Sequence, residues 1–244
     1  MKFLKKAGCE SVSDISRDHV TAYRGVLLGY GDSTQRQHIV AIKQFLRDAE
    51  RDDLVKRIRN PKPTAEGLER RKPRPFSDEE IKQFLRVAPP RVGLFFRTQI
   101  STGLAICDAT RLRAQHLQDG CVCISRLKTG KPVRVKISES LFNELRVALP
   151  FYEGHLMTGI VKWSSWIRNA MCRAGIYKRR ALTHRCRDTF VDRQLAANVP
   201  LPVIAAAIGD LISTVEKHYA SLESMRMRQQ IMQAPALEIP AIFP

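Results

Sequence analysis

The sequence has no run of about 18 apolar residues and no Lys-rich amphipathic stretch with an aromatic face. We therefore expect neither a membrane-spanning helix nor a membrane-surface helix. The N-terminus, MKFLKKAGCESVSD, is basic but carries no long apolar run, so a secretory signal peptide is not expected. These absences favour an intracellular protein that does not bind membranes.

Patterns that bind metals are also absent. The six cysteines form no paired CxxC motif, and no cluster of carboxylates is of the kind that holds a divalent cation. We expect no metal site and no cofactor, and reduced thiols rather than structural disulfides. The cysteines are Cys9, Cys107, Cys121, Cys123, Cys172 and Cys186.

Acidic residues are scarce relative to basic ones. The 244 residues include 24 Asp and Glu but 41 Lys and Arg, which gives a formal net charge of +17 and a pI near 10.1. Hydrophobic residues make up 44%, enough for a folded core. The excess positive charge predicts a polyanionic partner, and nucleic acid is the most common one.

Residues 11–59 have the pattern of a small helical domain. Ser16 precedes one amphipathic segment as a predicted N-cap, and Ser33 starts a second one. The second segment places four apolar residues on one stripe. They are Ile39, Ile42, Phe45 and Leu46. We assign residues 1–59 to this first domain.

Residues 60–76 have the composition of a basic, proline-containing linker. Eight basic residues lie from Lys56 to Arg74, with only Glu66 and Glu69 as acids. Two interpretations remain open: a solvated tether, or a strap that crosses a phosphate backbone. The candidate DNA-binding residues are Lys62, Arg70, Arg71, Lys72 and Arg74.

Residues 77–244 form the second predicted domain, mostly α with a small β-sheet (α+β). Ser77 and Glu80 make a capping box, and the next helical stretch breaks near Thr102-Gly103. The segment CVCISRLKTGKPVRVKI alternates on both sides of Thr129-Gly130, which predicts a β-hairpin. Its turn carries Lys128 and Lys131, and the rest of the chain to about residue 233 has a helical pattern.

The stretch 183–220 gathers chemically active side chains. His184 and Arg187 are three residues apart, so on a helix they share one face. The sequence Ala-Asn-Val-Pro at 197–200 breaks that helix, and Gly209 ends the next one. Tyr219 follows on a further short helix.

This arrangement resembles the tyrosine recombinases, the phage-integrase and Xer-type family. That family carries His-x-x-Arg at the head of a buried helix, a later Gly-His or Gly-Trp turn, and a Tyr about nine residues on. It also carries Thr-Gly-Leu-Arg upstream and a Lys at a hairpin turn. The matching residues here are His184, Arg187, Lys128 and Tyr219, and the resemblance runs over essentially the whole chain.

The resemblance implies a two-domain clamp on duplex DNA, with residues 1–59 as a SAM-like core-binding domain. Tyr219 would form a 3′-phosphotyrosyl bond, with Arg187 and His184 stabilising the phosphoryl group and Lys128 acting as general acid. Four protomers would act on two DNA sites, and a segment after Tyr219 would dock on a neighbour. The location would be cytoplasmic, at the nucleoid. The docking residues would be Met225, Met227, Ile231 and Met232.

Two positions depart from the family pattern. Ala105 stands where the family has the Arg of Thr-Gly-Leu-Arg, and Asp210 stands where it has His or Trp. Ala105 removes a phosphate contact, and Asp210 adds a negative charge beside the phosphate or pairs with Arg187. Both changes should slow the reaction. Three other arginines are candidates to replace the missing contact. They are Arg97, Arg111 and Arg113.

Three functions therefore stay open. The first is a site-specific recombinase, slowed or with a rearranged site. The second is a DNA-binding protein of the same fold that is catalytically impaired and has a regulatory or vestigial role. The third is a basic helical adaptor for RNA or protein, which would keep Tyr219 far from His184 and Arg187. Asp188 is expected to be structural, as a cap or a partner of Arg185.

Overall fold

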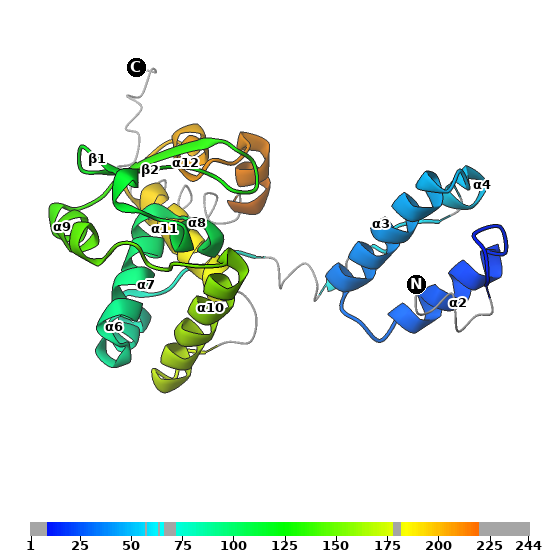
Figure 1. The fold of residues 1–244 in the computed structure, drawn as a ribbon, viewed down its shortest axis with the longest axis horizontal. Helices are drawn as coiled ribbons and strands as arrows, with labels where there is room; N and C mark the ends of the chain where they lie inside the picture. Colours follow the sequence, from blue (N-terminus) through cyan, green and yellow to red (C-terminus); the bar gives the residue numbers. More distant parts are fainter. Residues whose placement is uncertain (1–8, 57, 63, 66–71, 178–181, 220–244) are drawn as a thin grey trace, which may run out of the picture. The chain divides into compact units, whose positions relative to one another are not determined.

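A computed structural model describes residues 9–56, 58–62, 64–65, 72–177 and 182–219. The chain divides into two compact units, Met1–Lys72 and Pro73–Pro244. Figure 1 shows the helices and strands of both units along the chain. Residues 73–76, which the sequence analysis assigned to the linker, belong to the second unit in this division.

The first unit contains helices α2 (Arg17–Leu27), α3 (Asp32–Asp48) and α4 (Asp52–Val55). The Ser16 hydroxyl accepts the His19 N–H in a capping box, which confirms the predicted start of α2. Helix α3 starts at Asp32, with Gly31 as its N-cap, so the predicted start at Ser33 is one residue too late. Residues on and next to α2, α3 and α4 form one small core. Its buried members are Ile15, Val20, Leu27, Ile39, Leu46, Leu54, Val55 and Ile58.

The second unit is built mainly of helices. In order they are α6 (Asp78–Val87), α7 (Pro90–Thr102), α8 (Ile106–Thr110), the 3-10 turn η1 (Ala114–His116), α9 (Glu139–Ala148), α10 (Leu156–Arg173), α11 (Leu182–Ala196) and α12 (Leu201–Ile208). Residues 212–219 are also helical. The Ser77–Glu80 capping box at the start of α6 is confirmed.

A three-stranded antiparallel sheet lies beside these helices, in the order β1 (Leu117–Gln118), β2 (Cys121–Ser125), β3 (Pro132–Lys136). The predicted hairpin is confirmed as β2–β3. Its loop covers residues 126–131 and is closed by the Arg126 N–H, which donates to the Lys131 carbonyl at 2.8 Å. The two-residue strand β1 was not predicted, because it is too short to show an alternating pattern. The architecture is therefore mostly α with a small sheet, as the sequence predicted.

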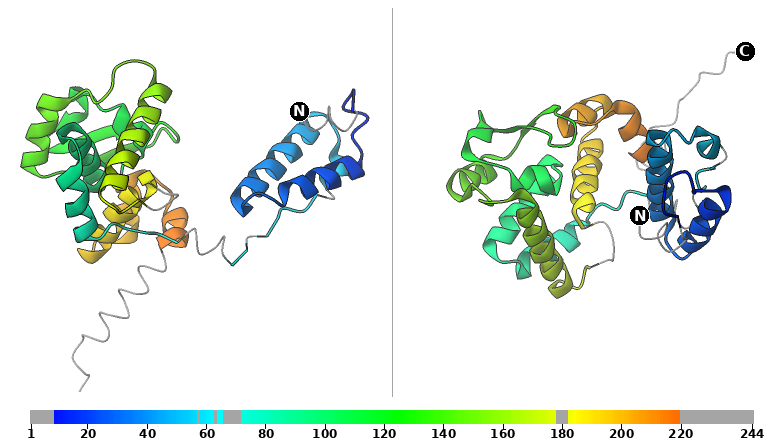
Figure 2. Two further views of the ribbon diagram at one scale, coloured as in Figure 1. Left: turned by 90° about the horizontal axis from the view of Figure 1, so that it is seen from below. Right: turned by 45° about the vertical axis from the view of Figure 1, so that its right-hand side comes forward.

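Helix α11 lies at the centre of the second unit. It packs along α7 and also contacts α10 and α12, and α12 in turn lies against β3. In Figures 1 and 2, α11 (yellow) runs between these neighbours. The ring of Phe95 on α7 stacks on Trp163 of α10 at a centroid distance of 4.1 Å, and both are fully buried. Helices α7 and α10, two of the neighbours of α11, are thus packed tightly against each other.

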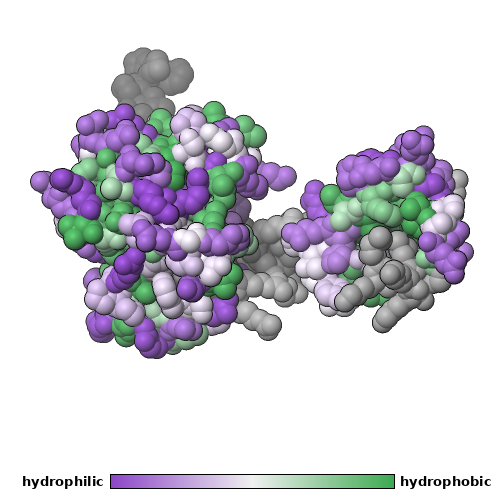
Figure 3. Space-filling model, viewed as in Figure 1, coloured by the Kyte–Doolittle hydropathy of each residue, from purple (hydrophilic) through white to green (hydrophobic). Residues whose placement is uncertain are grey.

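Hydrophilic side chains cover much of the visible surface of both units, with smaller apolar patches between them (Figure 3). Among the helices that the structure describes, none is both long enough and apolar enough to span a bilayer.

Candidate active site

Arg187, near the start of α11, is 8% exposed, and both terminal nitrogens of its guanidinium donate hydrogen bonds. Nη1 donates to the Gly103 carbonyl at 2.9 Å, and Nη2 donates to the Ile208 carbonyl at 3.0 Å. Nη2 also reaches the Asp210 carboxylate at 2.5 Å. Of the two arrangements considered for Asp210, the ion pair with Arg187 is the one observed.

The two helix ends that the sequence predicted, near Gly103 and at Gly209, place the carbonyl groups that Arg187 binds. Gly103 ends α7 and Gly209 ends α12, with φ of +65° and +64°, a backbone region that favours glycine. A Cβ on Gly103 would lie 2.8 Å from a ring carbon of Phe190. Glycine at this turn lets the chain pass close to α11 and aim its carbonyl at Arg187.

Arg126 is the residue that the sequence analysis missed. It follows β2, is 8% exposed, and its Nη1 donates to Asp210 Oδ1 at 3.1 Å and to the Ile208 carbonyl at 3.0 Å. Arg126 and Arg187 therefore meet at the same carboxylate and the same carbonyl. Burial lowers the pKa of Arg187, and the positive charge of Arg126 lowers that pKa further. No local pattern marks Arg126, because the partners that it shares with Arg187 lie more than 80 residues away.

Tyr219 is 3% exposed, and its hydroxyl donates to Asp188 Oδ1 at 2.9 Å. Burial raises the pKa of Tyr219, and the charge of Asp188 raises it further, whereas the charge of Arg187 lowers it. A phenol needs a nearby cation or base to act as a nucleophile near neutral pH. Arg187 is close enough to act on it, but the carboxylate is the direct partner.

Asp188 has a second partner in the segment that precedes α6. Its Oδ2 accepts the Arg74 backbone N–H at 3.0 Å. Arg185 contacts the same segment: Nε donates to the Arg74 carbonyl at 2.9 Å, and its guanidinium lies 3.8 Å from the centre of the Phe76 ring. The expected structural role of Asp188 therefore fits, but the proposed pairing with Arg185 is wrong. The side-chain partners are Tyr219 and, at 3.8 Å, His218.

His184 and Lys128 lie at the outside of this arrangement. His184 is exposed in the first turn of α11, and Lys128 is exposed in the hairpin loop. No hydrogen bond among the described residues joins either of them to Arg187 or Tyr219. Lys131, on the other side of the loop, donates instead from Nζ to the Asp210 carbonyl at 3.4 Å.

The three arginines considered as replacements at the Ala105 position have other partners. Arg97 pairs with Glu144, and the Arg113 guanidinium donates to the Leu112 carbonyl. Arg111 pairs with Asp108 at 3.0 Å. In the described part of the chain none of them hydrogen bonds to a partner of Arg187. Ala105 itself is the N-cap of α8.

The linker candidates are described only in part. Lys62, Lys72 and Arg74 are exposed, whereas Arg70 and Arg71 lie outside the described residues.

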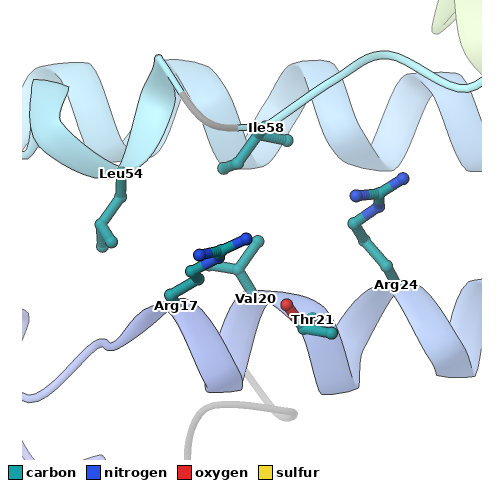
Figure 4. A pocket seen from close by; sticks show the side chains of 6 residues that line it. All are labelled: Arg17, Val20, Thr21, Arg24, Leu54 and Ile58. Carbon is teal, nitrogen blue, oxygen red and sulfur yellow. The ribbon is translucent and has the colours of Figure 1, made fainter.

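A second basic surface lies on the first unit. Arg17, Thr21 and Arg24 are exposed at intervals of four and three residues along α2. Figure 4 shows the two arginines and the threonine rising from α2 toward the side on which Leu54 and Ile58 lie.

The arrangement has a clear chemical capability. Two buried guanidinium groups converge on one carboxylate that is itself 29% exposed at its side chain, with a phenol close by. Arginine forks bind carboxylates and phosphates in the same way. A phosphate that replaced the carboxylate would have its charge stabilised beside a tyrosine hydroxyl.

Comparison with known proteins gave structural but no sequence matches. No family profile and no curated protein matches the chain. The catalytic domain of bacteriophage HP1 integrase is similar at 23% identity and a TM-score of 0.52, over 68% of this chain and all of that one. A lambda integrase dimer bound to a core site is similar at 15% identity and a TM-score of 0.68, over 93% of this chain and 85% of that one. XerH recombinase bound to its difH substrate is similar at 15% identity and a TM-score of 0.64, over 92% of this chain and 74% of that one. The chain therefore has the fold of the tyrosine recombinases.

Proposed function

We propose that the protein is a site-specific DNA recombinase or integrase that works through a covalent 3′-phosphotyrosyl intermediate. The observation that carries the proposal is the convergence of Arg187 and Tyr219. They come from α11 and from the helical residues 212–219: the Tyr219 hydroxyl donates at 2.9 Å to Asp188, the residue that follows Arg187 on α11. The fold and the excess positive charge support the same reaction.

In the proposed reaction the Tyr219 oxygen attacks a backbone phosphorus. The new Tyr–O–P bond forms as the bond from phosphorus to the 5′ oxygen breaks. The phenolic proton moves toward Asp188, which already accepts that hydrogen bond. Arg187 stabilises the negative charge on the phosphoryl oxygens. A hairpin lysine, Lys128 as expected from the sequence or Lys131 as its position suggests, donates a proton to the leaving oxygen.

The proposed DNA partner would be held by both units. Arg17 and Arg24 on α2, with Lys62, Lys72 and Arg74 after it, offer cations to the phosphate backbone. We also propose that several copies of the chain act together on two DNA sites. Dimers and a tetramer on DNA are described for lambda integrase.

The test is covalent trapping on nicked duplexes tiled across the DNA that flanks the gene. After cleavage such duplexes lose a short fragment, so the protein–DNA adduct accumulates and is seen on a denaturing gel. We expect an adduct that Tyr219→Phe abolishes and that Tyr177→Phe, a change of an exposed tyrosine in the same unit, retains. An adduct that survives Tyr219→Phe would contradict the assignment.

A second candidate function is a DNA-binding protein of this fold that does not cleave. It is favoured by the bond from Tyr219 to Asp188 and by the missing arginine at Ala105. Absence of an adduct, together with salt-sensitive binding to duplex DNA, would support this function instead. A basic adaptor for RNA or protein is less consistent with the hydrogen bond between Tyr219 and Asp188, which holds the tyrosine beside the residue next to Arg187.

A further inference from the structure

Arg126 and Arg187 share one anion although they come from different parts of the fold. Arg126 follows β2 and Arg187 belongs to α11, yet Nη1 of the first binds Asp210 Oδ1 and Nη2 of the second binds Asp210 Oδ2. Each carboxylate oxygen thus has its own guanidinium. Two non-bridging oxygens of a phosphodiester would present the same pair of acceptors.

The fold holds Arg126 at this position by several contacts. Its Nε lies 3.6 Å from the fully buried Asp108, which also accepts the Leu127 N–H at 2.8 Å. Its side chain passes directly over Gly209, where a Cβ would lie 2.6 Å from the Arg126 Cδ. Arg126 is therefore already oriented before any ligand binds, and orientation in advance is what transition-state stabilisation needs.

Arg126 also has unused hydrogen-bonding capacity. Its Nη1 makes all of the guanidinium hydrogen bonds, and in the described part of the chain Nη2 makes none. Asp210 is the most exposed member of the group, at 29% of its side chain, so it is the member that an incoming anion meets first. A phosphate that displaced it would find one arginine on each side.

We propose that Arg126 is a second phosphate-binding arginine that replaces the one missing at Ala105, and that Asp210 occupies the phosphate position until DNA binds. This inference rests on the proposed function for its catalytic meaning. Its binding statement, that the Arg126–Arg187 pair is a phosphate site, is tested separately. The alternative is that Arg126 serves only as a cap on the carbonyl groups at the end of α12.

The binding test uses inorganic phosphate and an Asp210→Ala background, in which the shared carboxylate is gone. Thermal unfolding is followed with and without phosphate, at equal ionic strength kept with chloride. We expect phosphate to raise the Tm of Asp210→Ala by about 3 °C more than that of the wild type. Adding Arg126→Gln should abolish this gain, whereas adding Arg134→Gln, which removes an exposed arginine from β3, should keep it.

Each result decides the inference. An equal gain with and without Arg126 would show that Arg126 is not a ligand, and no gain in Asp210→Ala would show that the pair binds no phosphate. The Tm of each variant with phosphate is compared with the Tm of the same variant without it. A general loss of stability from Arg126→Gln therefore does not affect the comparison. Arg126→Lys is a second variant that keeps the charge, and it should retain part of the gain.

The catalytic part is tested in the trapping assay. If the wild type forms an adduct, Arg126→Gln should slow it about a hundred- to a thousandfold, and Ala105→Arg in that variant should restore much of the rate. An unchanged rate in Arg126→Gln would overturn the inference while the proposed function stands. No adduct from the wild type, with the phosphate site intact, would reject the recombinase reaction and keep the site.

Discussion

Two aspartates, Asp188 and Asp210, hold the polar groups of the candidate site in the DNA-free protein. Asp210 forms ion pairs with both Arg126 and Arg187, and Asp188 accepts a hydrogen bond from the Tyr219 hydroxyl. Arginines that are 8% exposed require an anionic partner, because an uncompensated buried charge is strongly destabilising. The carboxylates therefore stabilise the fold, and under the proposed function a substrate phosphate would have to displace Asp210.

The first prediction concerns the acidity of Tyr219. The negative charge of Asp188 disfavours the phenolate form of Tyr219. Asp188→Asn removes this charge but keeps an oxygen that can accept the hydrogen bond from the hydroxyl. The pKa of Tyr219 should therefore fall toward the usual range of tyrosine, about 10. Absorbance at 295 nm during an alkaline titration measures it, and Tyr219→Phe identifies which step belongs to Tyr219. Identical titration curves for the wild type and Asp188→Asn would refute the prediction.

At the scale of elements, the end of α12 is the point where three segments meet. Its Ile208 carbonyl receives both Arg126 and Arg187, and Gly209 turns the chain directly beneath the Arg126 side chain. The last carbonyls of a helix carry partial negative charge, so two cations there are favourable. The position of α12 thus depends on the hairpin and on α11.

The second prediction compares two glycines in similar backbone conformations. Gly209 and Gly130 both have positive φ, but an added Cβ meets Arg126 and Val133 at the first and nothing within 4 Å at the second. Gly130→Ala should cost about 1 kcal/mol from backbone strain alone. Gly209→Ala should cost about 3 kcal/mol, since the neighbours must also move. Urea unfolding measures both, and equal losses would contradict the close approach.

The third prediction concerns how α11 is fixed to the segment before α6. Arg185→Ala removes the bonds to the Arg74 carbonyl and to Glu80 and the contact with Phe76, at a buried position. We expect a loss of about 3 kcal/mol in the free energy of unfolding.

The control for that prediction is Arg193→Ala on the same helix. Arg193 pairs with Asp78, but both side chains are largely exposed, so its loss should cost less than about 0.5 kcal/mol. The two variants remove the same charge from the same element. Similar losses would mean that the contacts of Arg185 do not fix the segment.

Local signals predicted the elements well, and long-range contacts could not be predicted. The N-cap at Ser16, the capping box at Ser77 and the hairpin at Gly130 depend on neighbouring residues, and the structure confirms them. Arg126 was missed because its partner Asp210 is 84 residues away in the sequence. The bond from Asp188 to Arg74 spans 114 residues, and no pattern within either segment indicates it.

At the scale of the whole molecule, the net charge of +17 is carried by a chain of two compact units. Long-range attraction to DNA should thus be strong, sequence-independent and weakened by salt. Contacts from both units would add to it.

The fourth prediction tests the first unit's share of that binding. Arg17→Gln with Arg24→Gln removes the two arginines of the α2 surface shown in Figure 4. The slope of log affinity against log salt for a duplex should become shallower by about 2 units. Fluorescence anisotropy measures it. The matched control is Arg146→Gln with Arg168→Gln, which removes two exposed arginines from α9 and α10. An equal change of slope in the two double variants would indicate that any two arginines contribute alike, and not the α2 surface in particular.

The double role of Asp188 has a practical consequence for protein engineering. One of its oxygens holds the backbone of Arg74 and the other holds Tyr219, so the connecting segment and the phenol share one carboxylate. A chimera that exchanged the first unit for a DNA-binding module of another protein should therefore be joined before Pro73. A junction placed after Phe76 would replace the residues that hold Asp188, and the exchange would then also alter the surroundings of the Tyr219 hydroxyl.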